Sequence, residues 1–212
     1  MSVEEWKNLF VTVGSFILGL ILAAGQLYTI WKMKKQSKDF EAEKNKPKKY
    51  GEAIKHESHY TLQIQTQLEE LRQYLTADRV QVLEFHNGTD FSTRKGYKLD
   101  CTYETLKYGN ESVKGLLENY PTTMLPIFMN KIIQEKKYFV PNVEQIAKCD
   151  MSTYAMKLNM HVGSFYDVSL EDSEGMSIGV LAVQFSKPQE LNADQLAMIE
   201  AKKIIIEELL TK

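Results

Sequence analysis

Residues 177–186 read SIGVLAVQFS, and this run decides the fold that the sequence predicts. Its positions are apolar on both sides of an extended chain, which is typical of a central strand covered on both faces. A helix is expected soon after it, because Asn192 and Gln195 have the spacing of a capping box. That helix has an apolar stripe interrupted at Lys203, formed by Leu196, Ile199, Ile206 and Leu210.

The residues before this strand predict further strands and helices of one sheet domain. Strands are expected at 79–86 (RVQVLEFH), 97–106, 138–140 and 163–170 (GSFYDVSL). Asn87-Gly88 is expected to turn the chain after the first of them, and Tyr97, Leu99, Cys101 and Tyr103 to share one face of the second. Pro121 is expected to open a helix (PTTMLPIFMNKIIQEKK), and a short helix to reach about residue 157. The order indicates an α+β domain with helices on the faces of a single sheet.

A helix with a heptad pattern precedes the first strand. Its apolar residues recur at spacings of three and four, most regularly at Ile64, Leu68, Leu71 and Leu75. Such a stripe packs on its own domain, on the same helix of a second chain, or on both in turn. We expect a parallel pairing of two chains through these four residues.

The sequence also predicts a membrane anchor at residues 9–31 (LFVTVGSFILGLILAAGQLYTIW). This run has no charged side chain, and a helix of this length crosses the ~30 Å hydrocarbon core of a bilayer. A cleaved signal peptide is the alternative, but the acidic Glu4 and Glu5 before the run and its length favour an anchor. Ser15, Gly19 and Ala23 recur every four residues, which fits close helix pairing in a membrane or the general abundance of small residues there.

The lysines that follow the span set the expected topology. Residues 32–50 form a basic linker, and basic segments stay on the cytoplasmic side. We therefore expect residues 1–8 outside the cell membrane, a single span at 9–31, and a cytoplasmic domain at 51–212. The lipid bilayer is one expected partner, since anionic lipids attract juxtamembrane lysines.

Composition excludes several classes of function. Twenty-six basic and 28 acidic residues give a net charge of −2, which does not indicate nucleic-acid binding. The two cysteines, Cys101 and Cys149, form no CxxC pair and have no metal-ligand spacing with the four histidines. No metal site, phosphate loop or catalytic triad is predicted.

Three segments give the soluble part a resemblance to a known family. They are the leading helix into RVQVLEFHNG (79–88), the hairpin GSFYDVSLEDSEGMSIGVLAVQFS (163–186) and the capped helix that starts LNADQLAMI (191–199). Together they resemble GAF domains, the small-molecule sensor modules related to PAS domains, over residues 51–210. The resemblance implies an antiparallel sheet with the first and last helices on one face, often forming a dimer bundle. The other face would enclose a ligand beneath the middle helices.

The same resemblance implies a ligand pocket near His86, Asn87, Cys101, Tyr103, Tyr154 and Tyr166. It does not identify the ligand, and no cofactor is predicted. A simpler interpretation of His86 and Asn87 is a hairpin turn with a histidine bonded to backbone. Cys101 as a nucleophile would need a nearby base such as His86, whereas a small buried thiol explains it more simply.

Three functions follow as hypotheses. The first is a membrane-anchored, homodimeric regulatory domain that binds a small molecule or an unidentified partner protein and acts on another protein. The second is a ligand-free membrane scaffold with a GAF-like fold. The third and weakest is a thiol-dependent enzyme that uses Cys101.

Overall fold

The computed structural model describes residues 28, 32, 34–35, 50–90 and 95–211. The chain separates into two compact units, 1–57 and 58–212, and all the strands belong to the second. The expected span at 9–31, with Ser15, Gly19 and Ala23, lies outside the described residues except for residue 28. Among the residues that are described, no helix has the length and apolar character needed to cross a bilayer.

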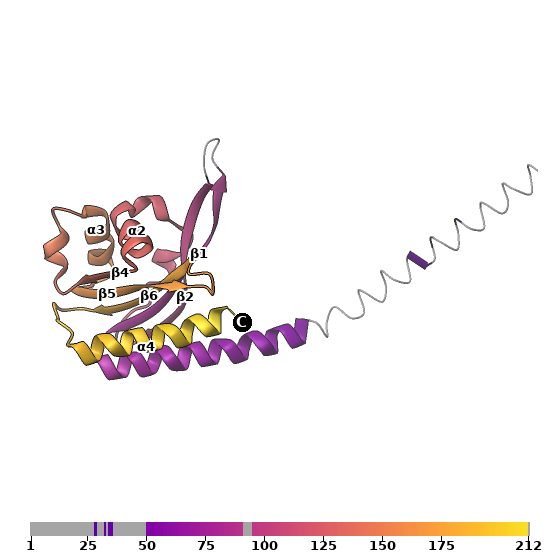
Figure 1. Ribbon diagram of the computed structural model, residues 1–212, viewed down its shortest axis with the longest axis horizontal. Helices are drawn as coiled ribbons and strands as arrows, with labels where there is room; N and C mark the ends of the chain where they lie inside the picture. The colour runs from indigo at the N-terminus through magenta and orange to yellow at the C-terminus, as the bar shows by residue number, and fades with distance from the viewer. Residues whose placement is uncertain (1–27, 29–31, 33, 36–49, 91–94, 212) are drawn as a thin grey trace, which may run out of the picture. The chain divides into compact units, whose positions relative to one another are not determined.

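One six-stranded antiparallel sheet forms the centre of the second unit, which confirms the α+β prediction (Figure 1). The strands lie in the order β3-β2-β1-β6-β5-β4. Their bounds are β1 Arg79–Asp90, β2 Lys95–Leu106, β3 Tyr120–Pro121, β4 Lys137–Val140, β5 Ser164–Glu171 and β6 Ser177–Phe185. Strand β6 lies beside β1 in the middle of the sheet and is buried along most of its length, as its apolar sequence predicts.

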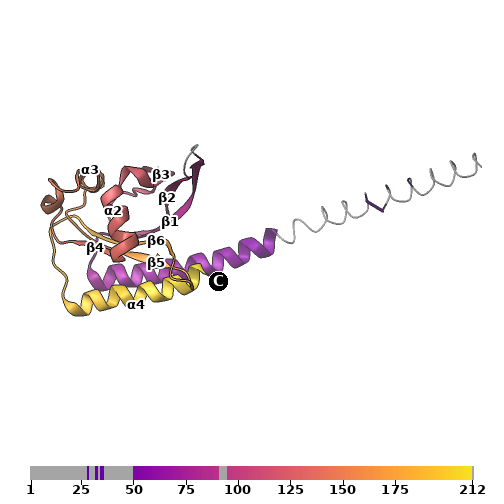
Figure 2. The same cartoon turned by 45° about the horizontal axis from the view of Figure 1, so that its top comes forward.

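Two helices lie side by side under one face of the sheet (Figures 1 and 2). One is the leading helix, whose described residues are 50–75, and the other is α4 (Ala193–Leu210). The capping box predicted for α4 is present, because Asn192 and Gln195 exchange side-chain to backbone hydrogen bonds of 2.9 and 3.0 Å. Lys202 of α4 donates to Gln67 of the leading helix at 2.7 Å and pairs with Glu70.

The four heptad residues lie inside the domain and not on a surface that a second chain could reach. Ile64, Leu68, Leu71 and Leu75 are each 0 to 1% exposed and pack under the sheet against residues of β1, β5 and β6. Such burial removes a large apolar area from water within a single chain. The stripe therefore packs on its own domain, and these four residues do not form a dimer interface.

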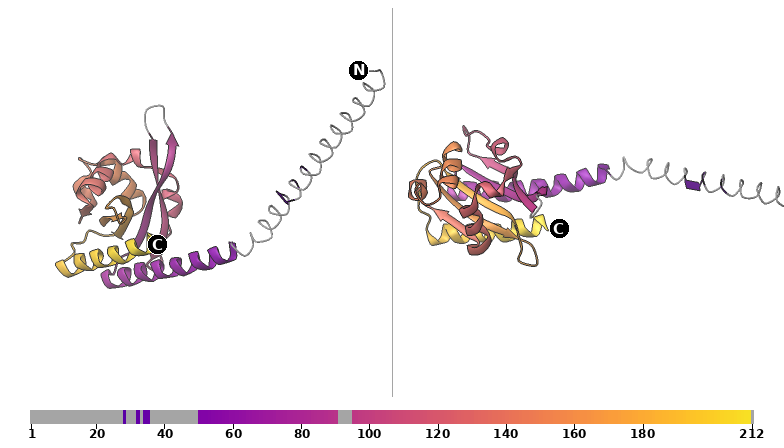
Figure 3. Two further views of the ribbon diagram at one scale, coloured as in Figure 1. Left: turned by 45° about the vertical axis from the view of Figure 1, so that its right-hand side comes forward. Right: turned by 90° about the horizontal axis from the view of Figure 1, so that it is seen from above.

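Short helices cover the opposite face of the sheet, as Figure 3 shows from above. They are η1 Lys114–Leu117, η2 Thr122–Met124, α2 Pro126–Asn130, η3 Lys131–Glu135, η4 Val143–Ile146 and α3 Met151–Asn159. The single helix expected from Pro121 is instead a 3-10 turn, an α-helical turn and a π-helical segment. Pro126 lacks a backbone N–H and begins a new helix at this point.

The first hairpin is longer than the sequence predicts. Asn87-Gly88 does not turn the chain, because β1 continues to Asp90 and pairs there with Lys95 of β2. Gly88 is needed for close approach of the two strands: a Cβ at this position would lie 1.9 Å from the carbonyl oxygen of Gly96. The prediction of a turn was wrong because a glycine within a strand can also mark a place where a neighbouring strand approaches closely.

A shift of register in the same hairpin changes which side chains share a face. Val82 pairs with Tyr103 while the next residue, Leu83, pairs with Cys101, so Thr102 is an extra residue. A bulge of this kind reverses the alternation of the strand. Cys101 packs in the core under the short helices, whereas Tyr103 packs against the core under the helix pair. The prediction that both face one way was therefore wrong.

The leading helix ends in a Schellman motif with threonine at the left-handed position. Ala77 N–H donates to the Arg72 carbonyl and Thr76 N–H to the Gln73 carbonyl, at 2.9 and 3.1 Å. Thr76 has a φ of 53°. Glycine is the usual residue at this position, because a β-branched side chain is strained there.

Thr76→Gly should raise the free energy of unfolding by about 1 kcal/mol, since it removes this left-handed strain. Thr66→Gly is the matched control, because Thr66 is exposed in the same helix with helical geometry; it should lower that free energy by about 0.5 kcal/mol. Urea unfolding of both variants measures the two values. A Thr76→Gly protein less stable than the parent would contradict the assignment.

Candidate functional site

The space between the sheet and the short helices is filled by the chain's own side chains. Phe128, Tyr138 and Phe165 pack together there, with ring centroids 6.2 Å apart for Phe128 and Tyr138 and 5.2 Å apart for Tyr138 and Phe165. Aromatic residues of this size account for much of the buried area of a core. This interior is therefore a packed core where the GAF resemblance leads us to expect a ligand.

The six predicted pocket residues do not converge on one site. The Nε2 atom of His86 lies 3.2 Å from the Oδ1 atom of Asp100, and Asn87 is exposed. Tyr154 of α3 donates to Glu144. Cys101 lies on the short-helix face of the sheet, while Tyr103 and Tyr166 lie on the helix-pair face.

Cys101 has the environment of an inert thiol. Burial, and next the nearby Glu104 carboxylate, raise the pKa of Cys101 to about 12. Gln81 donates to its sulfur at 3.4 Å. A nucleophilic cysteine needs a lowered pKa, so this site does not support the thiol-enzyme hypothesis.

A buried ion pair is the most unusual feature of the short-helix face. Lys157 of α3 and Asp167 of β5 form it at 2.7 Å, and their side chains are 1% and 0% exposed. The ammonium group also lies 4.1 Å from the ring centre of Phe165. Burial lowers the pKa of Lys157 and raises that of Asp167, while their mutual attraction opposes both shifts. One Asp167 oxygen has no hydrogen-bond partner among the described residues.

A second buried network crosses β1 and its neighbours. Arg79 Nη1 donates to Gln184 at 3.0 Å and to the Met160 carbonyl at 3.3 Å, and Nη2 donates to the Glu111 carbonyl at 3.1 Å. Its Nε lies 3.5 Å from the Glu104 carboxylate. The guanidinium group thus joins the sheet to the end of α3 and to the loop after β2.

Gln81 extends this network along the sheet. It donates to Glu104 at 2.9 Å and accepts from Gln184 at 3.1 Å. Buried polar groups are tolerated when they are hydrogen-bonded in this way.

A cleft of about 550 Å³ opens beside Arg79, within the range typical of ligand sites. Its lining comes from residues 78–79, 109–113 with 116, 159–162 and 184–186. The start of β1 and the end of β6 thus supply the floor, while the loop after β2 and the end of α3 supply the walls. This cleft is the candidate functional site.

His161 is an exposed residue of the cleft lining, and its backbone is in a strained conformation. Its φ is 56°, in the left-handed region that favours glycine. Helix α3 ends there in a Schellman motif, in which Val162 N–H donates to the Lys157 carbonyl and His161 N–H to the Leu158 carbonyl, both at 2.9 Å. His161 also borders a second hollow of about 370 Å³. Strained residues of this kind occur often at functional sites.

The described residues contain no group of three or more histidine, cysteine, aspartate or glutamate side chains that could hold a metal ion. The cysteines of this part of the chain are both free. The cleft lining itself presents hydrogen-bonding groups and the charged side chains of Asp78, Arg79 and Glu111.

The fold and the site define the class as an α+β domain with a helix pair on one sheet face and a cleft at the sheet's edge. Comparison with solved structures identifies the fold as that of GAF domains. The phycoerythrobilin-bound GAF domain of a cyanobacterial phytochrome matches with a TM-score of 0.57 at 16% identity, over 71% of this chain and 84% of that one.

Two further GAF domains give similar values. GAF3 from Slr1393 of Synechocystis sp. PCC6803, in its photoproduct state, has a TM-score of 0.56 at 18% identity, over 71% of this chain and 92% of that one. The blue-light absorbing form of the Thermosynechococcus elongatus PixJ GAF-domain has a TM-score of 0.55 at 13% identity, over 73% and 89%. The sequence matches no family model and no curated protein.

The buried polar residues were missed by the sequence reasoning, although a signal was present. Gln81, Asp167 and Gln184 occupy positions in strands that are otherwise apolar. A polar side chain at an inward position of a buried strand needs a partner, and it therefore marks a network or a site.

Lys157→Met should lower the free energy of unfolding by about 3 kcal/mol, because it leaves the Asp167 carboxylate buried without a cation. The double variant Lys157→Met/Asp167→Leu should recover most of that loss, since both groups are then apolar. Urea unfolding of the parent, the single variant and the double variant measures these changes in the free energy of unfolding.

The deficit of Lys157→Met should shrink as pH falls from 7 to 4. Burial raises the pKa of Asp167 and Lys157 opposes that rise, so without Lys157 the folded state takes up a proton at a higher pH than the folded parent or the unfolded chain does. A deficit that grows on acidification would contradict this interpretation.

Proposed function

We propose that this protein is a membrane-anchored regulatory domain that binds a small molecule or partner protein and acts on another protein. The observation that carries the proposal is the cleft beside Arg79 on a GAF fold whose interior is packed. The solved structures with the same fold include bilin-bound photoreceptor domains, which supports a sensory role in general.

A ligand-free membrane scaffold is the second candidate. The aromatic side chains in the interior favour it, because Phe128, Tyr138 and Phe165 are buried and pack against one another where a ligand was expected. The two candidates differ in what the edge cleft does: it binds a ligand in the first and is an empty surface feature in the second.

The membrane anchor rests on the sequence of residues 9–31. The full chain should sediment with membranes and resist alkaline carbonate, whereas a chain that lacks residues 1–31 should stay in the supernatant. Protease added to intact cells should leave the C-terminal domain whole, because the basic linker keeps it inside. Recovery of the full chain in the supernatant would contradict the anchor.

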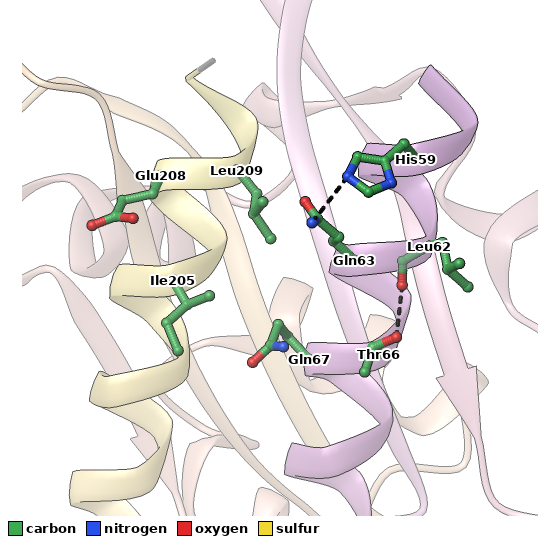
Figure 4. A pocket seen from close by; sticks show the side chains of 8 residues that line it. All are labelled: His59, Leu62, Gln63, Thr66, Gln67, Ile205, Glu208 and Leu209. Atoms are coloured by element: carbon green, nitrogen blue, oxygen red, sulfur yellow. Dashed lines mark hydrogen bonds between the residues drawn. The ribbon is translucent and has the colours of Figure 1, made fainter. Parts of the chain in front are cut away.

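We place the homodimer surface on the outer side of the helix pair, since the heptad residues are buried. A groove of about 420 Å³ runs there between the leading helix and α4 (Figure 4). Leu62 contributes one apolar edge and Ile205 and Leu209 the other. Leu62 is 67% exposed, and an exposed leucine beside an apolar groove fits an interface better than a solvated face.

Leu62→Cys in a Cys149→Ser background should form a disulfide-linked dimer when membranes that contain the full chain are oxidised. Ile205→Lys should reduce this cross-link several-fold, because it places a charge in the groove. Met124→Cys is the control, since Met124 is 57% exposed on the short-helix side. Cross-linking is measured on non-reducing gels. Equal cross-linking of Leu62→Cys and Met124→Cys would contradict the proposed dimer surface.

A further inference from the structure

The cleft beside Arg79 has the chemistry of a site for a small zwitterion, and we propose that its ligand is a free α-amino acid with an apolar side chain. This inference rests on the proposed regulatory function and names the ligand class of the same site. It follows from the charges, the spare donors and the apolar part of the cleft lining.

Arg79 supplies the group that would hold a carboxylate. A guanidinium group has five N–H donors, and three of those on Arg79 are used by Met160, Gln184 and Glu111. Two N–H groups are left, one on Nη2 and one on Nε, and the Nε atom lies 3.5 Å from the Glu104 carboxylate. Arg79 is only 7% exposed, so its orientation is fixed by the surrounding bonds. A fixed, partly unused guanidinium group is well suited to receive a carboxylate oxygen.

Asp78 supplies the group that would hold an ammonium. Both Asp78 and Arg79 line the cleft. Burial raises the pKa of Asp78, but hydrogen bonds from the Ser186 N–H and hydroxyl, together with the exposed Lys107 ammonium 3.7 Å away, lower that pKa below its usual value. Asn159, the last residue of α3, also lines the cleft, so the negative C-terminal end of that helix lies beside it.

The balance of charge favours a zwitterion over an ion of either sign. A simple anion would approach Arg79 but also meet Asp78 and the negative end of α3, with Glu104 behind the guanidinium group. A simple cation would meet Arg79. A molecule that carries both charges pairs each with its complement and needs no net charge from the site.

Part of the lining between these polar ends is apolar, beside polar residues such as Glu111, Ser112 and Asn159. Val113, Leu116, Met160, Val162 and Phe185 all line the cleft. Such a lining removes an aliphatic or aromatic side chain from water. The volume of about 550 Å³ accommodates any of the apolar amino acids.

His161 is the residue that we expect to close the site over the ligand. It holds an imidazole in the cleft lining in a conformation where glycine would relieve strain. A side chain kept at such a cost is consistent with use in binding. Asn159, the last residue of α3, lines the same cleft and adds a second exposed hydrogen-bonding group.

The first test titrates each of the twenty L-amino acids singly into the full chain in detergent, by calorimetry and thermal shift. At least one apolar amino acid should bind with a dissociation constant below 1 mM. For that amino acid, the acid without its amino group and the amine without its carboxylate should each bind at least tenfold more weakly. Absence of binding by all twenty, or equal binding of either analogue, would overturn the proposal.

The second test separates binding from stability. His161→Gly should weaken binding at least tenfold while the unliganded melting temperature stays the same or rises, since the strain is relieved. Lys136→Gly is the matched control, because Lys136 has a φ of 64° at another helix end and does not line the cleft. Its dissociation constant should stay within twofold of the parent.

An unchanged affinity in His161→Gly would also overturn the proposed closure by His161. Failure of the titration would overturn the ligand class alone. The membrane and cross-linking measurements test the anchor and the dimer without any ligand, so failure of the proposed function is seen separately.

Discussion

Burial of the sheet on both faces is the constraint on which the rest of the structure depends. Strands β5 and β6 are covered from below by the leading helix and α4 and from above by the short helices. This double cover explains why the heptad stripe of the leading helix is used inside the domain. It also explains why the buried polar side chains on those strands need partners from the protein in place of water, as Asp167 has in Lys157.

The parts of the fold that depend on local sequence could be predicted, and the parts that depend on register could not. The apolar run of β6 and the Asn192 capping box predict a central strand and a capped helix, and both are present. The bulge at Thr102 and the strand pairing at Gly88 are set by contacts across the hairpin. Since a shift of one residue moves side chains to the opposite face, the bulge separates Tyr103 from Cys101, which we had expected to share a face.

The candidate site also depends on contacts that local sequence does not predict. His86, Cys101 and Tyr166 were chosen by topology, and the structure places them in separate surroundings. Arg79 begins β1, directly after Asp78, and it meets the end of α3 only through the folded chain, as its bond to Met160, 81 residues later, shows. Contacts of such long sequence separation leave no local pattern. What the sequence does carry is the polarity of Gln81, Asp167 and Gln184 in apolar strands.

The ion pair of α3 has a consequence for how the cleft can change shape. Helix α3 has nine residues, and Lys157 fixes it to Asp167 at one point on β5. Sliding or rotating the helix by one residue would separate the two charges in the core, so α3 has one allowed position instead of a continuous range. The wall that α3 gives to the cleft is therefore stationary, and rearrangement on occupancy is left to His161, beyond the end of the helix, and to the loop at 109–113.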